Sequence, residues 1–400
     1  MRIKLLTLAL FAVTFGAVLF YPQLQAKYGK PGPQANVTAH VTVSQIQSPR
    51  IDVVFALDTT GSMSGLIEAA KEKIWSIAST MASAQPTPEI RIGLVAYRDR
   101  GDAYVTRVVD LSSDLDSVYA ALMDFQAGGG GDTPESVNQA LNDAVHAMSW
   151  SEGDQAYRVI FLVGDAPPHM DYNEAQYPEI IAEARKKGIV VNTIQCGNIG
   201  TTVEPWNAIA NLGSGDFLHV DQSGSAVAMN TPFDEEIAEL SARLDDTRLY
   251  FGNAEQKAAM KSKMDATRKL NTEATAASKA RRAVFNAAEG GRKNLLGDNE
   301  LVSAVTSGEI SLDELDADEL PASLEPLAPE EQAQVISDLA RERAELQGRI
   351  SELAENRQRF IAEKEEEAGG FDDSLDRKLY DVVTEQAKAA GFEYVEGPEY

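Results

Sequence analysis

Apolar residues recur in two alternating patterns between about residue 50 and residue 250. Short runs rich in β-branched and aromatic residues, typical of buried strands, are each followed by a stretch with helical spacing. The first run is 51–57, and the apolar positions after it are Leu66, Ala69, Ile74, Ile77 and Met81. Such alternation predicts a mostly parallel, doubly wound sheet that is covered by helices on both faces.

The same reading places the remaining elements of this region. We expect strands at 90–97, 103–111, 158–163, 189–195 and 217–220. We expect helices at 115–125, 134–148, 177–187, 205–212 and 233–249. Pro134 suits the first position of its helix. Only residues 98–102 separate two of the strands, which is too short for a parallel crossover, so the strand at 103–111 is predicted to pair antiparallel at one edge.

The character of the chain changes after residue 250. Convincing strand patterns stop, and Ala, Glu, Lys and Arg dominate. We expect a long helix over 253–288, an acidic connection at 312–320, a second long helix from Pro329 and a last amphipathic piece at 371–390. The second helix carries apolar residues seven positions apart, interrupted by Arg343 and Arg357. This all-α, partly coiled-coil region therefore favours a helical hairpin or an antiparallel pairing.

The N-terminus has the pattern of an export signal. Arg2 and Lys4 precede an apolar run at 5–20, Pro22 follows it, and Ala26 offers a small residue for cleavage. The run is short for a membrane span. We expect either a cleaved signal peptide or an N-terminal anchor over 1–26, a linker at 27–49, an α/β domain at 50–250 and a helical region at 251–400. The bulk of the chain is then exported, to the periplasm or the exterior, with inner-membrane anchoring as the alternative.

Charge and cysteine content narrow the function classes. The formal net charge is −26 and Cys196 is the only cysteine of the 400 residues. Strong acidity argues against nucleic acid or an anionic membrane as a partner. A single cysteine excludes an internal disulfide and a multi-cysteine metal site. We expect Cys196 to be a small buried group.

Candidate chemistry gathers in three segments, two of them just after strands and one at the start of a helix. Asp58-Thr59-Thr60-Gly61-Ser62 follows the first strand, a glycine-rich stretch (128–131) leads to Asp132 and Thr133, and Asp165 follows the strand at 158–163. The carboxyl ends of parallel strands meet at one edge of a sheet, where such folds bind ligands. Carboxylate and hydroxyl oxygens suit hard cations.

These three segments together resemble the metal-ion-dependent adhesion site (MIDAS) of von Willebrand factor type A domains of bacterial exported type. The resemblance covers about residues 50–245, and Thr60 stands where the motif usually has serine. It implies a Rossmann-like fold and a Mg²⁺ site, with Mn²⁺ or Ca²⁺ as alternatives. By the resemblance, Thr60, Ser62 and Thr133 contact the ion, while Asp58 and Asp165 act largely through water. Neutral hydroxyls leave the charge of the cation incompletely compensated, so we expect an open position that accepts Asp or Glu from a partner protein.

Neighbouring polar residues have simpler interpretations. Asp132 and Glu135 suit the start of a helix, where acidic side chains complement the dipole, with support of the metal site as the alternative. We expect His169 to be exposed, and Arg100-Gly101-Asp102 to be an ordinary turn. The acidic stretch at 312–320 lacks the spacing of a calcium loop.

The sequence thus favours a non-enzymatic, cation-dependent adhesion or scaffold module without catalytic residues. The alternative is an assembly or metal-insertion cofactor that works with an AAA+ ATPase, which a cytoplasmic location would favour. A hydrolase is the third hypothesis. Met63 stands at the nucleophile position of the one G-x-S-x-G-like stretch, Gly61 to Gly65.

Overall fold

The computed structural model describes residues 49–131, 133–153, 155–221, 229–368 and 374–394. The apolar run at 5–20 and Asp132 lie outside these ranges. Among the described helices, none combines the length and apolar character needed to cross a membrane.

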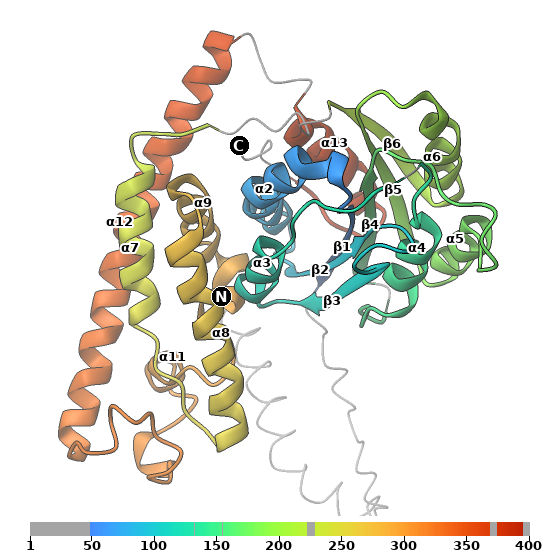
Figure 1. The fold of residues 1–400 in the computed structure, drawn as a ribbon. Coiled ribbons are helices and arrows are strands. Elements are labelled where there is room, and N and C mark those ends of the chain that lie inside the picture. The colour runs from blue at the N-terminus through green and yellow to red at the C-terminus, as the bar shows by residue number, and fades with distance from the viewer. Residues whose placement is uncertain (1–48, 132, 154, 222–228, 369–373, 395–400) are drawn as a thin grey trace, which may run out of the picture. The chain divides into compact units, whose positions relative to one another are not determined.

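A six-stranded sheet forms the core of the α/β part (Figure 1). Its order is β3-β2-β1-β4-β5-β6. The strands are β1 (Arg50–Asp58), β2 (Glu89–Tyr97), β3 (Thr106–Ser112), β4 (Ala156–Gly164), β5 (Ile189–Cys196) and β6 (Ser214–Val220). All neighbours pair in parallel except β2 and β3, which are antiparallel. The predicted fold class and the antiparallel edge strand are confirmed.

Helices cover both faces of this sheet (Figure 1). One face packs against α2 (Ser64–Ala82), α3 (Leu115–Met123) and α13 (Leu375–Lys388). The other packs against α4 (Val137–His146), α5 (Tyr177–Lys186) and α6 (Gly200–Leu212). The strands of a parallel sheet buried on both faces read as continuous apolar runs, and β1 is buried at every position after Arg50.

Two helix predictions in this part need correction. Pro134 does not open a helix, because α4 begins at Val137 with Ser136 before it. The helix expected at 233–249 is present as α7 (Asp234–Asp246), but it packs against α9 and α12 and not against the sheet. Its buried Ile237 and Leu244 share a core with Leu346, Ile350 and Leu353 of α12.

The helical region lies beyond α2 and α3 in Figure 1. It comprises α8 (Ala254–Glu273), α9 (Ala276–Ala287), α10 (Arg292–Leu296), α11 (Leu301–Thr306) and α12 (Pro329–Ala368), with short 3-10 turns at Glu289–Gly291 and Leu312–Glu314. The single helix predicted over 253–288 is wrong. The helical conformation is interrupted at Ala274, whose backbone is extended. Thr275 then caps α9 by accepting a hydrogen bond from the Ser278 backbone N–H. The break lets α8 pack on α3 and α9 pack on α2.

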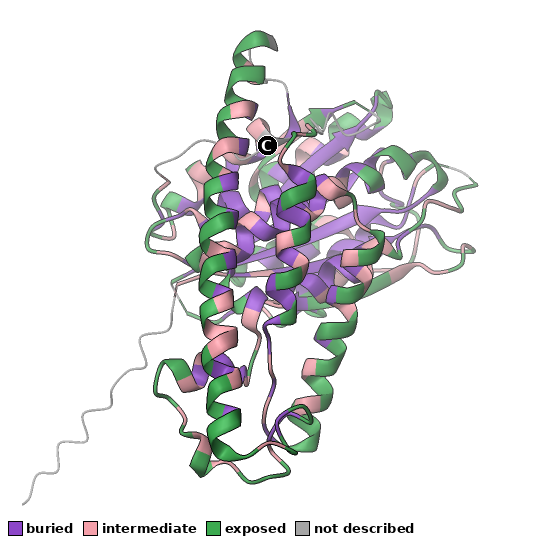
Figure 2. Ribbon diagram, turned by 90° about the vertical axis from the view of Figure 1, so that its left-hand side faces the viewer, coloured by how far each residue is buried: buried purple, intermediate pink, exposed green. Residues whose placement is uncertain are grey.

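The predicted interruptions of the heptad pattern are buried ion pairs. Arg343 donates to both carboxylate oxygens of Glu300, each at 2.9 Å. Arg357 donates to Asp234 at 3.1 Å. Because Arg357 meets the start of α7 and Arg343 meets Thr247 just past its end, α12 and α7 run antiparallel. The exposed residues of α12 lie on its outer face and at its ends (Figure 2).

A buried charge network joins the helical region to the sheet part. The Arg282 guanidinium on α9 donates to Asp116 on α3 at 2.7 and 2.5 Å and to Asp245 on α7 at 2.9 Å. Burial alone raises the pKa of Asp116, but the charges of Arg282 and Lys263 outweigh it and hold this pKa well below its usual range. Buried ion pairs therefore connect the helical region to α3 of the sheet part.

Candidate metal centre

The site lies where the strand order reverses direction, between β1 and β4. From β1 the chain proceeds outward to β2 and β3, and from β4 it proceeds in the other direction. Loops at the carboxyl ends of these two strands diverge there and leave a crevice. Four of the five residues predicted from sequence line one cavity of about 420 Å³ in this place: Thr60, Ser62, Thr133 and Asp165.

Asp58, the fifth predicted residue, lies beneath this cavity and is fully buried. Its Oδ1 accepts hydrogen bonds from the Thr60 backbone N–H (2.8 Å) and the Thr60 hydroxyl (2.7 Å). Its Oδ2 is buried and has no hydrogen-bond partner. Burial raises the pKa of Asp58 to about 7, and the nearby charge of Asp165 raises it further. The two hydrogen bonds from Thr60 lower this pKa but do not outweigh the burial. Asp58 therefore fixes Thr60 and leaves one carboxylate oxygen unused.

The hydroxyls occupy the more open side. The Thr60 and Ser62 oxygens are 3.4 Å apart, and the side chains of Ser62 and Thr133 are exposed. Ser62 belongs to a short 3-10 turn, Gly61–Met63, that leads directly into α2. Hard oxygen donors that are partly exposed suit a hydrated cation.

The glycine-rich loop is held against the first loop by its backbone. The Gly61 N–H donates to the Gly129 carbonyl at 3.3 Å, and the Gly128 N–H donates to the Thr59 carbonyl at 3.1 Å. Gly129 has a φ of +79°, and a Cβ there would collide with the Asp102 carboxylate. That carboxylate accepts from the Gly130 N–H at 3.2 Å. The Asp102 of the Arg-Gly-Asp turn thus shapes the site.

Close packing also explains the glycine before Asp165. A Cβ on Gly164 would collide with the Tyr97 hydroxyl and lie 3.0 Å from the Asp58 Cβ. The Asp165 carbonyl accepts from the Thr202 hydroxyl at 2.7 Å, so α6 anchors this loop. Asp165 is only 4% exposed.

Two residues near the cavity differ from their predictions. Glu135 does not lie in the first turn of α4. It is 3% exposed, lines the cavity and has one buried carboxylate oxygen without a hydrogen-bond partner. The pKa of Glu135 is raised to about 9, mainly by its burial and to a lesser extent by the negative charges of Asp58 and Asp99.

The prediction that His169 is exposed is wrong. Its ring is 6% exposed and stacks on Tyr172, with ring centroids 3.9 Å apart. Nδ1 lies 2.8 Å from Asp171 and Nε2 lies 3.5 Å from Asp99. Asp171 and Tyr172 belong to the same loop as His169, whereas Asp99 comes from the loop after β2, and the sequence alone did not show that these two loops meet.

Arg98 was not singled out from the sequence, although it positions two loops of the site. Its Nε donates to the Thr59 carbonyl at 3.0 Å, and its Nη2 donates to the Gln126 carbonyl at 2.7 Å. The guanidinium also packs on the Tyr104 ring, 4.5 Å from its centroid. An arginine directly after a strand was the only signal, and it is weak.

The donor set fits a hard cation. Among the described residues, no three His, Cys, Asp or Glu side chains gather closely enough to hold a metal by themselves. A cation in this cavity would therefore depend on the hydroxyl oxygens of Thr60, Ser62 and Thr133. The unpartnered Asp58 Oδ2 is consistent with a positive charge nearby, because a buried carboxylate oxygen without a partner is costly.

Comparisons with known proteins find similarity over the α/β part of the chain. Residues 52–224 match a family model described as von Willebrand factor A domain. Human von Willebrand factor A domain-containing protein 7 is 32% identical over 139 residues, which is 34% of this chain and 14% of that protein. An ariadne-like RING finger protein of Acanthamoeba polyphaga mimivirus is 27% identical over 123 residues, 31% of this chain and 12% of that protein. The chain therefore spans only a small part of these relatives.

Among solved structures, similarity extends to proximal thread matrix protein 1 from the mussel byssus, whose structure has a zinc-occupied MIDAS motif. That match has 16% identity and a TM-score of 0.33, and covers 43% of this chain and 42% of the mussel protein.

Proposed function

We propose that this chain, whose residues 52–224 match a family model described as von Willebrand factor A domain, is a divalent-cation-dependent protein-binding module. The bound cation, Mg²⁺ in the first instance, would accept a carboxylate oxygen from an Asp or Glu of a partner protein. The domain type is commonly a metal-dependent interaction module. We also propose that the domain is of the bacterial exported type and that its cavity is a MIDAS.

One observation carries it. Thr60, Ser62, Thr133 and Asp165 come from three separate segments and line one cavity, above a buried Asp58 with an unused oxygen. Thr60, Ser62 and Thr133 would hold the ion by their hydroxyls, while Asp58 and Asp165 would orient these hydroxyls and bound water. Neutral donors leave most of the positive charge of the ion available to an incoming carboxylate.

The cavity lining supports a binding role more than a catalytic one. Of the described residues that line it, none is His, Cys or Lys. Cys196 is fully buried, and burial raises the pKa of its thiol, so it is a poor nucleophile. We propose that the protein is not an enzyme and that the helical region supplies a second contact or a spacer.

Export remains part of the proposal. It rests on the apolar run at 5–20 behind Arg2 and Lys4, which is outside the described residues. A protein-binding module in the periplasm or at the cell surface would meet partner proteins there and would not meet nucleic acid. Fractionation of cells that express the full chain tests this point, and recovery in the cytoplasm would contradict it.

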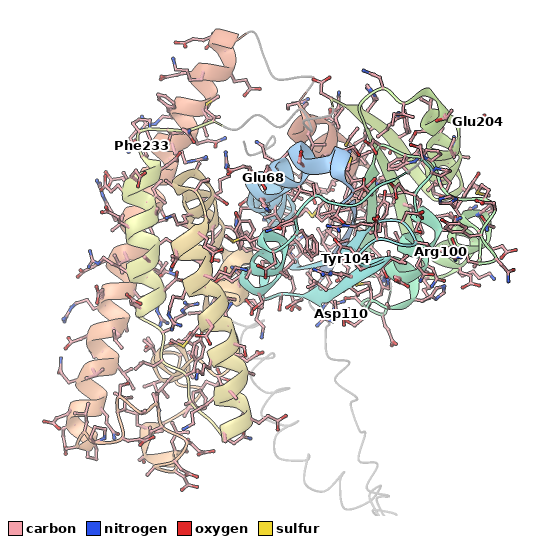
Figure 3. The ribbon with its side chains drawn as sticks, viewed as in Figure 1. Glu68, Arg100, Tyr104, Asp110, Glu204 and Phe233 are labelled. Carbon is pink, nitrogen blue, oxygen red and sulfur yellow. The ribbon has the colours of Figure 1, made fainter. Side chains whose placement is uncertain are left out.

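Calorimetric titration of the purified protein with Mg²⁺ and Mn²⁺ tests the metal site. We expect binding by the wild type and loss of binding in Asp58→Ala, because Thr60 loses its acceptor and the cavity loses a negative charge. Glu68→Ala is the matched control, since Glu68 is an exposed carboxylate on α2 that pairs with Lys71 (Figure 3). Equal affinities of the wild type and Asp58→Ala would contradict the proposal.

Partner binding is tested by capture from an envelope extract with and without EDTA. A partner retained with Mg²⁺ and released by EDTA is the expected result. Retention that EDTA does not affect would contradict a cation-bridged contact.

A further inference from the structure

Glu135 is a buried acid that the proposed ligand set does not use. It lies between the glycine-rich loop and α4, and its side chain lines the same cavity as Thr60 and Asp165. One carboxylate oxygen is buried without a hydrogen-bond partner. The other, Oε1, would lie 3.7 Å from a Cβ on Gly130, and that same Cβ would lie 3.3 Å from the Thr60 Cβ. Glu135 and Thr60 therefore both lie close to the same position beside Gly130.

The backbone fixes this residue in place. The Glu135 N–H donates to the Pro167 carbonyl at 3.0 Å, and the Glu135 carbonyl accepts from the His169 N–H at 3.1 Å. These two bonds tie it to the loop that begins with Asp165. The carboxylate is thus presented to the cavity by two loops of the site.

Helix capping does not explain the side chain. α4 begins at Val137 and no side chain caps it. The Val137 N–H is satisfied at 2.8 Å by the backbone carbonyl of Glu135, not by its carboxylate. The expected complement to the helix dipole is therefore not the role of this acid.

The strongest charges around the carboxylate among the described residues are negative. They are those of Asp58, Asp99, Asp102 and Asp165. The nearby arginines have other partners. Arg98 donates to two backbone carbonyls, and Arg100 pairs with Glu174. An acid buried among acids is expensive to ionise. A cation in the cavity would remove that cost.

We propose that Glu135 is an internal carboxylate ligand of the cation in this cavity, in addition to the three hydroxyls that would hold the ion and the two aspartates that would orient them. The inference rests on the proposed function. With Glu135 bound, the ion meets one more negative charge, so it is held more tightly and attracts an external carboxylate less strongly. Glu135 would then set the balance between holding the cation and binding the partner.

Mn²⁺ titration by calorimetry and electron paramagnetic resonance tests this inference on the full chain. We expect Glu135→Gln to weaken Mn²⁺ binding at least tenfold. Glu204→Gln is the matched control: the same charge is removed from an exposed side chain on α6, and the affinity should stay within twofold (Figure 3). Unfolding in EDTA checks the fold, and Glu135→Gln should be no less stable than the wild type, since it removes a buried unpaired acid.

A second readout counts the water on the ion. Eu³⁺ luminescence lifetimes in H₂O and D₂O should show about one more coordinated water in Glu135→Ala than in the wild type. Wild-type Mn²⁺ affinity in Glu135→Gln, or an unchanged water count, would overturn the role of Glu135 alone. Absence of Mn²⁺ binding by the wild type would overturn both this inference and the proposed function.

Discussion

Two buried aspartates in this protein have opposite surroundings. Asp58 at the metal site and Asp116 at the helical junction are both fully buried. Asp116 receives two hydrogen bonds from Arg282 and one from Thr267, and its pKa falls well below the usual range despite its burial. Asp58 accepts two hydrogen bonds from Thr60, which carries no charge, and burial raises the pKa of Asp58 to about 7.

The two aspartates differ in whether a cation of the protein compensates their charge. At the junction, Asp116 and Asp245 both pair with Arg282, so the network holds α9 of the helical region on α3. At the rim of the sheet, Asp58 and Glu135 each keep a buried oxygen without a hydrogen-bond partner. Burial of charge is costly unless it is compensated. A cation from solution would therefore lower the cost of buried charge most at the rim, where Asp58 and Glu135 lie.

The largest expected effect is at the junction. Arg282→Met should leave Asp116 and Asp245 buried without their cation and lower the free energy of unfolding by about 3–5 kcal/mol. Urea denaturation measures it. Arg268→Met is the control, because Arg268 is 69% exposed and pairs with Asp265 on the surface, where a loss within about 1 kcal/mol is expected. Similar losses in both variants would show that the junction network does not stabilise the fold.

The next effect is a pH dependence at the rim. The folded pKa of Asp58 is about 7, above its ordinary 3.8, so between these values the folded carboxyl keeps a proton that the unfolded chain has released. The free energy of unfolding in EDTA should therefore fall as pH rises through this window, by roughly 2–4 kcal/mol. Glu135, with a pKa of about 9, acts in the same direction.

Thermal unfolding between pH 4.5 and 8, with EDTA or with Mg²⁺, measures this dependence. Asp58→Asn keeps an acceptor for Thr60 and should make the EDTA curve flatter, with greater stability than the wild type at pH 8. Mg²⁺ should recover the stability of the wild type only. If the variant and the wild type follow the same EDTA curve, Asp58 does not titrate in this window.

A smaller effect is expected in the glycine-rich loop. Gly129→Ala places a Cβ at positive φ and against Asp102, which should lower the free energy of unfolding by about 1–2 kcal/mol and weaken Mg²⁺ binding. Gly131→Ala is the control, because nothing lies within 4 Å of its Cβ position and its φ is not in the left-handed region. Denaturation and calorimetry of both variants decide the point. An intact Mg²⁺ affinity in Gly129→Ala would show that the site tolerates movement of this loop.

Much of the fold followed from local pattern. The runs at 51–57 and 158–163 are apolar except for Asp52 and Arg158, because strands buried on both faces have no solvated side. The short link 98–102 allowed only an antiparallel neighbour. Element ends were less certain. Pro134 suits a helix start, which led to a wrong prediction. The Glu135 backbone instead pairs with Pro167 and His169 in the loop after β4, and α4 begins only at Val137.

By itself, the sequence determined that carboxylates and hydroxyls follow two strands of a parallel sheet and a glycine-rich stretch before a helix, since chain order and period are local properties. Tertiary structure alone decided which of the other acids and bases joined them. Glu135 and His169 are buried, and Arg98 positions two loops. Arg343 and Arg357, which interrupt the heptad pattern, form buried ion pairs. Each of these outcomes depends on a partner distant along the chain, and no local pattern encodes the position of such a partner.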